Sequence, residues 1–149
     1  MKKIFLLFIL FIFITGLASA QQWTEEQKDV WRTVQTYSYL YNSNNMSEFY
    51  NYFDNSYWAW NYDGAALLKR DNRGEKMNYW AVNTEGNSYF VTPFKITING
   101  NFAYADFIYK EISHTKDGKS ISDVGHYTDI LMKVNGKWLI VGDHGDMSN

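Results

Sequence analysis

The chain has 149 residues, a formal net charge of −2, no cysteine, and 19% aromatic residues, among them 6 Trp and 12 Tyr. This length suits one domain with one core, and the absence of cysteine excludes a disulfide framework. A weak negative charge without a basic run argues against a nucleic-acid partner. The aromatic content can fill a core or line an apolar pocket.

The N-terminus predicts a secretory signal peptide over residues 1–20. Lys2 and Lys3 form a charged start, Ile4–Ile14 is an uninterrupted apolar run, and Ala18-Ser-Ala20 fits a cleavage site. The run is shorter than the about 20 apolar residues that span a membrane, so no stable membrane anchor is expected after cleavage. Residues 21–149 are then a single exported domain, periplasmic or extracellular. Loss of the two lysines takes its net charge from −2 to −4.

Helices are predicted in the first half of this domain. Thr24-Glu-Glu-Gln27 is a capping box, and apolar residues follow it at spacings of three and four. A long helix is therefore expected from about Thr24 to Tyr41. A short helix over Met46–Phe53 and a third helix over residues 72–82 complete the set.

The remaining segments predict strands. Pro93 implies that its strand is an edge strand or carries a bulge, because proline cannot donate to a central ladder. Asn135-Gly136 predicts a tight hairpin, since both central residues of a type I′ turn need positive φ. The expected strands are Asn55–Trp60, Tyr89–Ile98, Phe102–Ser113, a strand that ends at Val134, and Trp138–His144.

This order of elements predicts an α+β fold. The helices lie on one side of a strongly bent antiparallel sheet, which wraps around the long first helix. The result is a cone-shaped roll with one open mouth. A concave site with apolar walls and a few polar groups is the default place for a small ligand.

The stretch His126–Asp146 carries a family resemblance that extends over Gln27–Asp146. Together with the order of elements, it resembles the nuclear transport factor 2-like superfamily, which includes SnoaL-like and ketosteroid isomerase-like proteins. The resemblance implies the cone-shaped roll, often dimeric through the outer sheet face, in enzymes, binding modules and assembly domains alike. The segments most similar to the association domain of calcium/calmodulin-dependent kinase II are Ile98-Asn-Gly-Asn-Phe-Ala103, Thr128, Gly136-Lys-Trp138 and Val141-x-x-His144.

Ketosteroid isomerase uses a carboxylate base, a tyrosine and a protonated aspartate. The resemblance places Tyr37 on that tyrosine and Asp129 on the protonated aspartate. The base would fall near Trp60, and an indole cannot take a proton in this chemistry. The sequence therefore favours a binding domain over this particular reaction.

Strand alternation supplies further site candidates. Tyr104, Asp106 and Lys110 share one face of their strand, and Tyr127 and Asp129 share one face of the next. If the registers match, all five face the cone. The resemblance to the kinase association domain puts pocket arginines at the positions of Lys110 and Asp129, so a Lys110–Asp129 pair here would favour a neutral polar ligand. The alternative is an exposed ion pair of little energetic value.

Aromatic and acid–base residues complete the candidates. Asp106 is either an acid or base buried among apolar neighbours or a solvent-facing residue. Trp58 and Trp60 share a face and either wall a ligand or fill the core. Asp143-His144-Gly-Asp146 holds metal-ligand residue types in a weak pattern, so no metal or cofactor is expected. The resemblance instead matches His144 to a histidine common at the end of the family's last strand.

Three functions follow from these observations. The leading one is an exported domain that binds a small, partly apolar ligand in an aromatic cone. The second is a SnoaL-like or isomerase-type enzyme, with Tyr37, Asp106, Asp129 and His144 as acid–base candidates. The third is a structural module that forms a homodimer through a convex face carrying Thr128, Ile130 and Met132. The predicted ligand site consists of Tyr37, Trp58, Trp60, Tyr104, Asp106, Lys110, Tyr127, Asp129 and His144.

Overall fold

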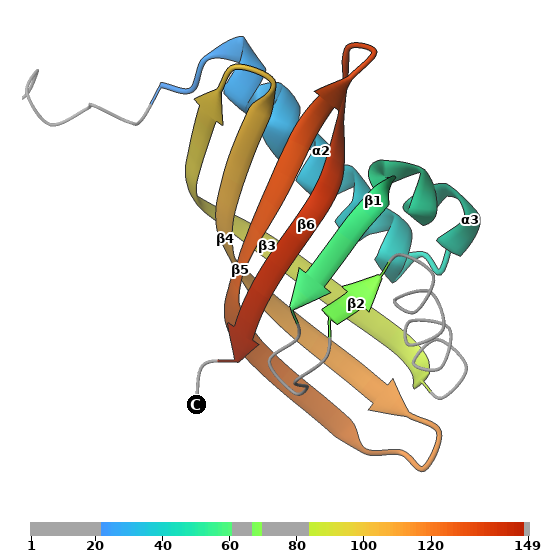
Figure 1. Ribbon diagram of the computed structural model, residues 1–149. Coiled ribbons are helices and arrows are strands. Elements are labelled where there is room, and N and C mark those ends of the chain that lie inside the picture. Colours follow the sequence, from blue (N-terminus) through green and yellow to red (C-terminus); the bar gives the residue numbers. More distant parts are fainter. Residues whose placement is uncertain (1–21, 61–66, 70–83, 148–149) are drawn as a thin grey trace, which may run out of the picture.

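The computed structural model describes residues 22–60, 67–69 and 84–147. They form a six-stranded sheet with the order β2-β1-β6-β5-β4-β3, antiparallel except for the β1–β6 pair (Figure 1). The predicted signal peptide and the predicted helix over 72–82 lie outside these ranges. The elements are α2 Glu25–Asn42, α3 Met46–Phe49, the 3-10 helix η1 Tyr50–Tyr52, β1 Phe53–Trp60, β2 Leu67–Lys69, β3 Thr84–Asn99, β4 Phe102–Thr115, β5 Ser120–Val134 and β6 Lys137–Met147.

Helix α2 confirms the predicted capping box. The Gln27 amide donates to Thr24 Oγ1 over 3.2 Å, and the Thr24 amide donates to Gln27 Oε1 over 2.9 Å. Two N–H groups that a helix start leaves unpaired are thereby satisfied. The second helix is shorter than predicted, because the chain tightens from α3 into η1 after Phe49. No helix within the described ranges is long and apolar enough to cross a membrane.

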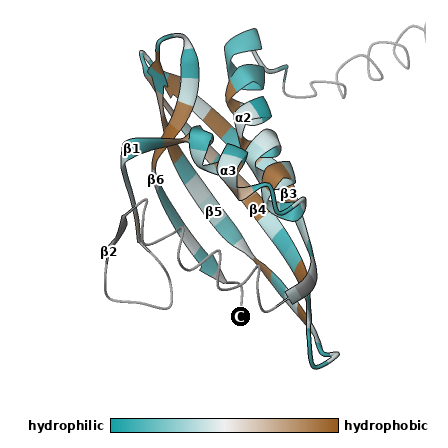
Figure 2. Ribbon diagram, turned by 90° about the vertical axis from the view of Figure 1, so that its right-hand side faces the viewer, coloured by the Kyte–Doolittle hydropathy of each residue, from teal (hydrophilic) through white to brown (hydrophobic). Residues whose placement is uncertain are grey.

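The core lies between α2 and the concave face of the sheet. Figures 1 and 2 show both α2 and α3 on this face. Val34 of α2, Phe107 of β4, Leu131 of β5 and Ile140 of β6 are all buried. The Trp31 ring meets the Phe107 ring edge-on, with 6.1 Å between centroids. Burial of this apolar face is what holds the bent sheet against the helix.

The β5–β6 hairpin confirms the predicted turn but contains a bulge. Asn135 and Gly136 have φ values of 51° and 80°. The pairing then shifts between Ile130 and Leu131, since Leu131 pairs with Ile140 and Ile130 with Gly142. Val141 is the extra residue. Each residue of β6 beyond it lies on the opposite face from the one that an unbroken ladder would give.

The β4–β5 hairpin closes with a three-residue loop. The Thr115 amide donates to the Lys119 carbonyl and the Gly118 amide donates to the Thr115 carbonyl, each over 2.9 Å. Gly118 has a φ of 82°, which is typical of a type I turn followed by a G1 bulge. This loop places Asp106 opposite Thr128. A two-residue turn would have shifted the ladder by one residue.

Strand β3 confirms the prediction made from Pro93. It lies at the edge of the sheet formed by the described strands. Its pairing with β4 also shifts between Pro93 and Lys95, which leaves Phe94 as the extra residue. The proline therefore lies where a missing N–H breaks no central ladder.

Candidate functional site

Two tyrosine–aspartate pairs lie side by side on the concave face. Asp129 of β5 and Asp143 of β6 are cross-strand neighbours and are only 1% and 3% exposed. Tyr37 Oη, from α2, donates to Asp129 Oδ2 over 2.8 Å, and Tyr57 Oη, from β1, donates to Asp143 Oδ2 over 2.6 Å. Carboxylates are seldom buried so completely, and they require hydrogen bonds when they are. These four residues form the candidate site.

Burial and nearby negative charge keep the Tyr37 phenol protonated. Burial, followed by the negative charge of Asp129, raises the pKa of Tyr37 well above its ordinary value, and Asp143 acts in the same direction. Tyr37 is therefore a hydrogen-bond donor at neutral pH. Because the one proton of this phenol is donated to Asp129, the site offers a ligand its carboxylate oxygens, which can accept from a hydroxyl group and can take part in proton transfer.

A row of aromatic rings leads away from the carboxylates along the same face. The Tyr127 and Tyr109 rings meet at 5.6 Å, Tyr109 stacks on Tyr89 at 5.5 Å, and Tyr89 meets Tyr41 at 5.7 Å. The row ends at a hollow of about 190 Å³ beside the end of α2, which Tyr41 helps to line. The concave face thus combines an apolar wall with buried polar groups, as ligand sites do.

Comparison with known proteins identifies the fold. No family model and no curated protein matches the sequence. A presumed scytalone dehydratase from Novosphingobium aromaticivorans is 18% identical with a TM-score of 0.75, over 83% of this chain and 85% of that chain. A presumed dehydratase of the nuclear transport factor 2-like family from Streptomyces avermitilis is 12% identical with a TM-score of 0.74, over 84% and 97%. This chain has the nuclear transport factor 2-like fold.

A third structure with this nuclear transport factor 2-like fold matches the more specific resemblance. It is a presumed calcium/calmodulin-dependent kinase II association domain from Xanthomonas campestris, 15% identical with a TM-score of 0.66, over 80% of this chain and 85% of that chain. At such identities the likeness establishes the fold alone. The predicted cone-shaped α+β roll is confirmed, while the site has to be argued from its residues.

Within this fold, three predicted site residues share the concave face. Tyr37, Tyr127 and Asp129 lie together there, and the contact between Tyr37 and Asp129 is direct. The resemblance to ketosteroid isomerase had placed the same two residues in one site. Their roles in binding or catalysis remain predictions.

The predicted placement of Tyr104, Asp106 and Lys110 is wrong. All three lie on the convex face, where Thr128 Oγ1 donates to Asp106 Oδ1 over 2.7 Å. The cause is the three-residue β4–β5 loop, which sets the register so that Asp106 pairs with Thr128. Asp106 therefore shares the face of Thr128 and not that of Asp129. The predicted pair between Lys110 and Asp129 consequently does not form.

His144 and Trp58 also lie outside the cone, which corrects their predicted placement. The bulge at Val141 turns His144 to the convex face, where it is exposed opposite Thr128. Trp58 is 48% exposed on that face. The backbone of Trp60 pairs with β2 and β6, and its side chain lies outside the part that the structure describes.

Sequence reasoning missed Tyr57 and Asp143 as site residues. Alternation along β1 puts Tyr57 on the opposite face from Trp58 and Trp60, and the sequence had assigned the pocket or the core to the two tryptophans. Asp143 reaches the concave face only because of the bulge at Val141. The signal available in the sequence was an aspartate that closely follows the apolar run Leu139–Val141 of the last strand.

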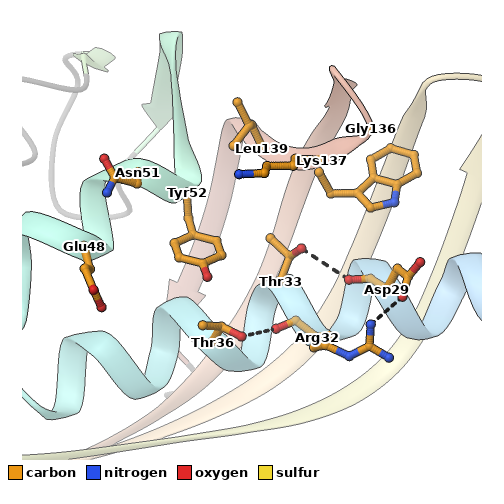
Figure 3. Close-up of a pocket in the computed structure, with 11 residues that line it drawn as sticks. Asp29, Arg32, Thr33, Thr36, Glu48, Asn51, Tyr52, Gly136, Lys137 and Leu139 are labelled. Carbon is orange, nitrogen blue, oxygen red and sulfur yellow. Dashed lines mark hydrogen bonds and ion pairs between the residues drawn. The ribbon is translucent and has the colours of Figure 1, made fainter.

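A second hollow lies outside the cone, between the flank of α2, η1 and the tip of the β5–β6 hairpin (Figure 3). This groove has a volume of about 610 Å³ and is lined by residues that include Arg32, Tyr52, Lys137 and Leu139. Arg32 forms an exposed ion pair with Asp29. Charges that are solvated and paired with each other recognise a ligand less strongly than the buried pairs of the cone.

Proposed function

We propose that this chain binds a small, partly apolar organic molecule on the concave face of its cone. One observation carries the proposal: two carboxylates, Asp129 and Asp143, are buried side by side, and each is held by a phenol at the start of a row of rings. Buried polar groups at one end of an apolar wall fix the orientation of a ligand. The two fold neighbours described as presumed dehydratases are consistent with small-molecule chemistry on this fold.

An acid–base enzyme is the second candidate. It is favoured by the adjacent carboxyl groups of Asp129 and Asp143, of which Asp129 is held by the protonated phenol of Tyr37 and Asp143 by the hydroxyl group of Tyr57. The resemblance puts the isomerase base near Trp60, so in this chain Asp143 would have to act as the base. Turnover that Asp143→Asn abolishes while binding survives would distinguish an enzyme from a binding domain.

Ligand binding can be tested with 2-naphthol, which has a flat apolar body, one hydroxyl donor and its own fluorescence. We expect wild-type protein to bind it saturably in a fluorescence titration. Asp129→Asn and Asp143→Asn each lower the affinity about tenfold, or about 1.4 kcal/mol, because an amide replaces a charged acceptor. Asp106→Asn is the matched control, since it makes the same change on the convex face of the same sheet.

The melting temperature of each variant shows whether it has folded. Similar losses of affinity in all three variants would show that the concave site is not the binding site. Failure of the wild-type protein to bind 2-naphthol saturably would count against the proposed function itself.

We also propose that the chain is exported, with residues 1–20 removed. The charged start, the apolar run and the Ala18-Ser-Ala20 site support this proposal. Mass spectrometry of protein recovered from outside the cytoplasm should give the mass of residues 21–149. A mass that still includes Met1–Ala20 would contradict it.

The convex face supports a further proposal, a homodimer. Tyr104, Ile108 and Val124 are 43%, 39% and 42% exposed on it. Ile130 lies on the same face, opposite Tyr104. Exposed apolar side chains that gather on one face mark an interaction surface, and the family resemblance implies that a second copy covers it.

A further inference from the structure

Four of the described glycines lie inside paired strands and have no conformational reason to be glycine. Positive φ values are confined, among the described glycines, to those at the turns, Gly100, Gly118 and Gly136. Three of these strand glycines, all except Gly86, pair with a large aromatic residue on the neighbouring strand. The pairs are Gly125 with Tyr109, Gly142 with Trp58 and Gly145 with Tyr127.

At Gly145 the neighbouring ring occupies the place of a side chain. A Cβ atom added there would lie 2.2, 2.5 and 2.6 Å from the Cε2, Cδ2 and Cζ atoms of Tyr127. Real Cβ atoms do not approach other atoms so closely, and all three of these atoms belong to one side chain. The Tyr127 ring therefore lies directly on the backbone of β6.

The Tyr127 ring lies next to the two buried carboxylates of the candidate site. Tyr127 pairs with Gly145, and the next pair on the concave face is Asp129 with Asp143. On its other side the Tyr127 ring meets Tyr109 at 5.6 Å and is further flanked by Phe107. A ring displaced from β6 must consequently move outward from the sheet and leave its place beside the two carboxylates.

We propose that Gly145 is a positioning residue of the candidate site. By leaving the surface of β6 without a side chain, it lets the Tyr127 ring lie flat on the strand beside the Asp129–Asp143 pair, where the ring forms part of the apolar wall of the site. This inference rests on the proposed function, because it assumes that the ligand binds at those carboxylates.

Gly145→Ala tests the inference, with Gly142→Ala as its matched control. A Cβ at Gly142 lies no closer than 3.3 Å to any atom, faces Trp58 on the convex side, and belongs to the same strand. We expect Gly145→Ala to weaken 2-naphthol binding about tenfold. It should also lower the melting temperature by about 5 °C, as overpacking does. Gly142→Ala should leave the affinity within about twofold.

A double-mutant cycle separates displacement of the ring from a general loss of stability. In a Tyr127→Ala background there is no ring to displace, so Gly145→Ala should change the melting temperature little. An equal fall in melting temperature in both backgrounds would overturn the proposal. Wild-type affinity of Gly145→Ala for 2-naphthol would overturn it too.

These results are distinct from failure of the proposed function. If wild-type protein binds 2-naphthol and Gly145→Ala binds it equally well, only the positioning role is lost. If wild-type protein does not bind, the proposed function fails. In that case, a smaller effect of Gly145→Ala on the melting temperature in the Tyr127→Ala background would still support the contact between Gly145 and Tyr127. An equal effect in both backgrounds would overturn that contact as well.

Discussion

Gly125→Ala is expected to destabilise the domain strongly. A Cβ at this position would lie 2.1 Å from the main-chain oxygen of Asp146 and 2.7 Å from the Tyr109 ring. Unlike the ring beside Gly145, a main-chain carbonyl cannot rotate away, so the end of β6 would have to separate from β5. We expect a loss of about 3 kcal/mol or more in the free energy of unfolding, measured by urea denaturation.

Gly86→Ala provides the control for this prediction. Gly86 also lies in a strand, β3, but no atom comes within 4 Å of a Cβ built on it. Its replacement should change stability by no more than about 0.5 kcal/mol. If Gly125→Ala melts close to the wild-type temperature, the close approach of β5 and β6 described here is wrong.

The second large effect concerns the convex face. Wild-type protein is expected to sediment as a dimer at micromolar concentration, and Ile108→Lys to sediment as a monomer. Ile108 is on the convex face of β4, next to His126 of β5, so a lysine there would have to lose its hydration when a second copy covers this face. A central contact of this kind is worth about 2 kcal/mol, or about a thirtyfold rise in the dissociation constant.

Tyr39→Lys is the matched control for the dimer. Tyr39 is 68% exposed, but it belongs to α2, on the other side of the sheet. A lysine near the end of a helix is also favourable, so the fold should be undisturbed. A monomeric wild-type protein, or equal dissociation of both variants, would show that the convex face does not mediate assembly.

Local features of the fold were determined by the sequence itself. The capping box of Thr24 and Gln27 involves residues three apart, and the turn at Asn135-Gly136 depends on the φ values of two neighbours. Pro93 likewise predicted an irregular edge strand. Signals of this kind are readable because the interactions that decide them lie within one short segment. The contact between Tyr37 and Asp129, by contrast, was expected from the family resemblance.

The composition of the site was decided by tertiary structure. The Lys116–Lys119 segment could close with two or three loop residues, and the three-residue loop moved Asp106 to the convex face. At Val141 a single extra residue brought Asp143 into the cone and turned His144 out.

The packing of β1 explains why this bulge is not a local property. Strand β1 pairs with Ile140 and Gly142 on either side of Val141, and its own pairing shifts at the same place, between Phe53 and Trp58. The irregularity thus coincides on three adjacent strands, β1, β6 and β5. Since a shift of one residue exchanges the two faces of a strand, contacts between distant segments decided which carboxylates are buried.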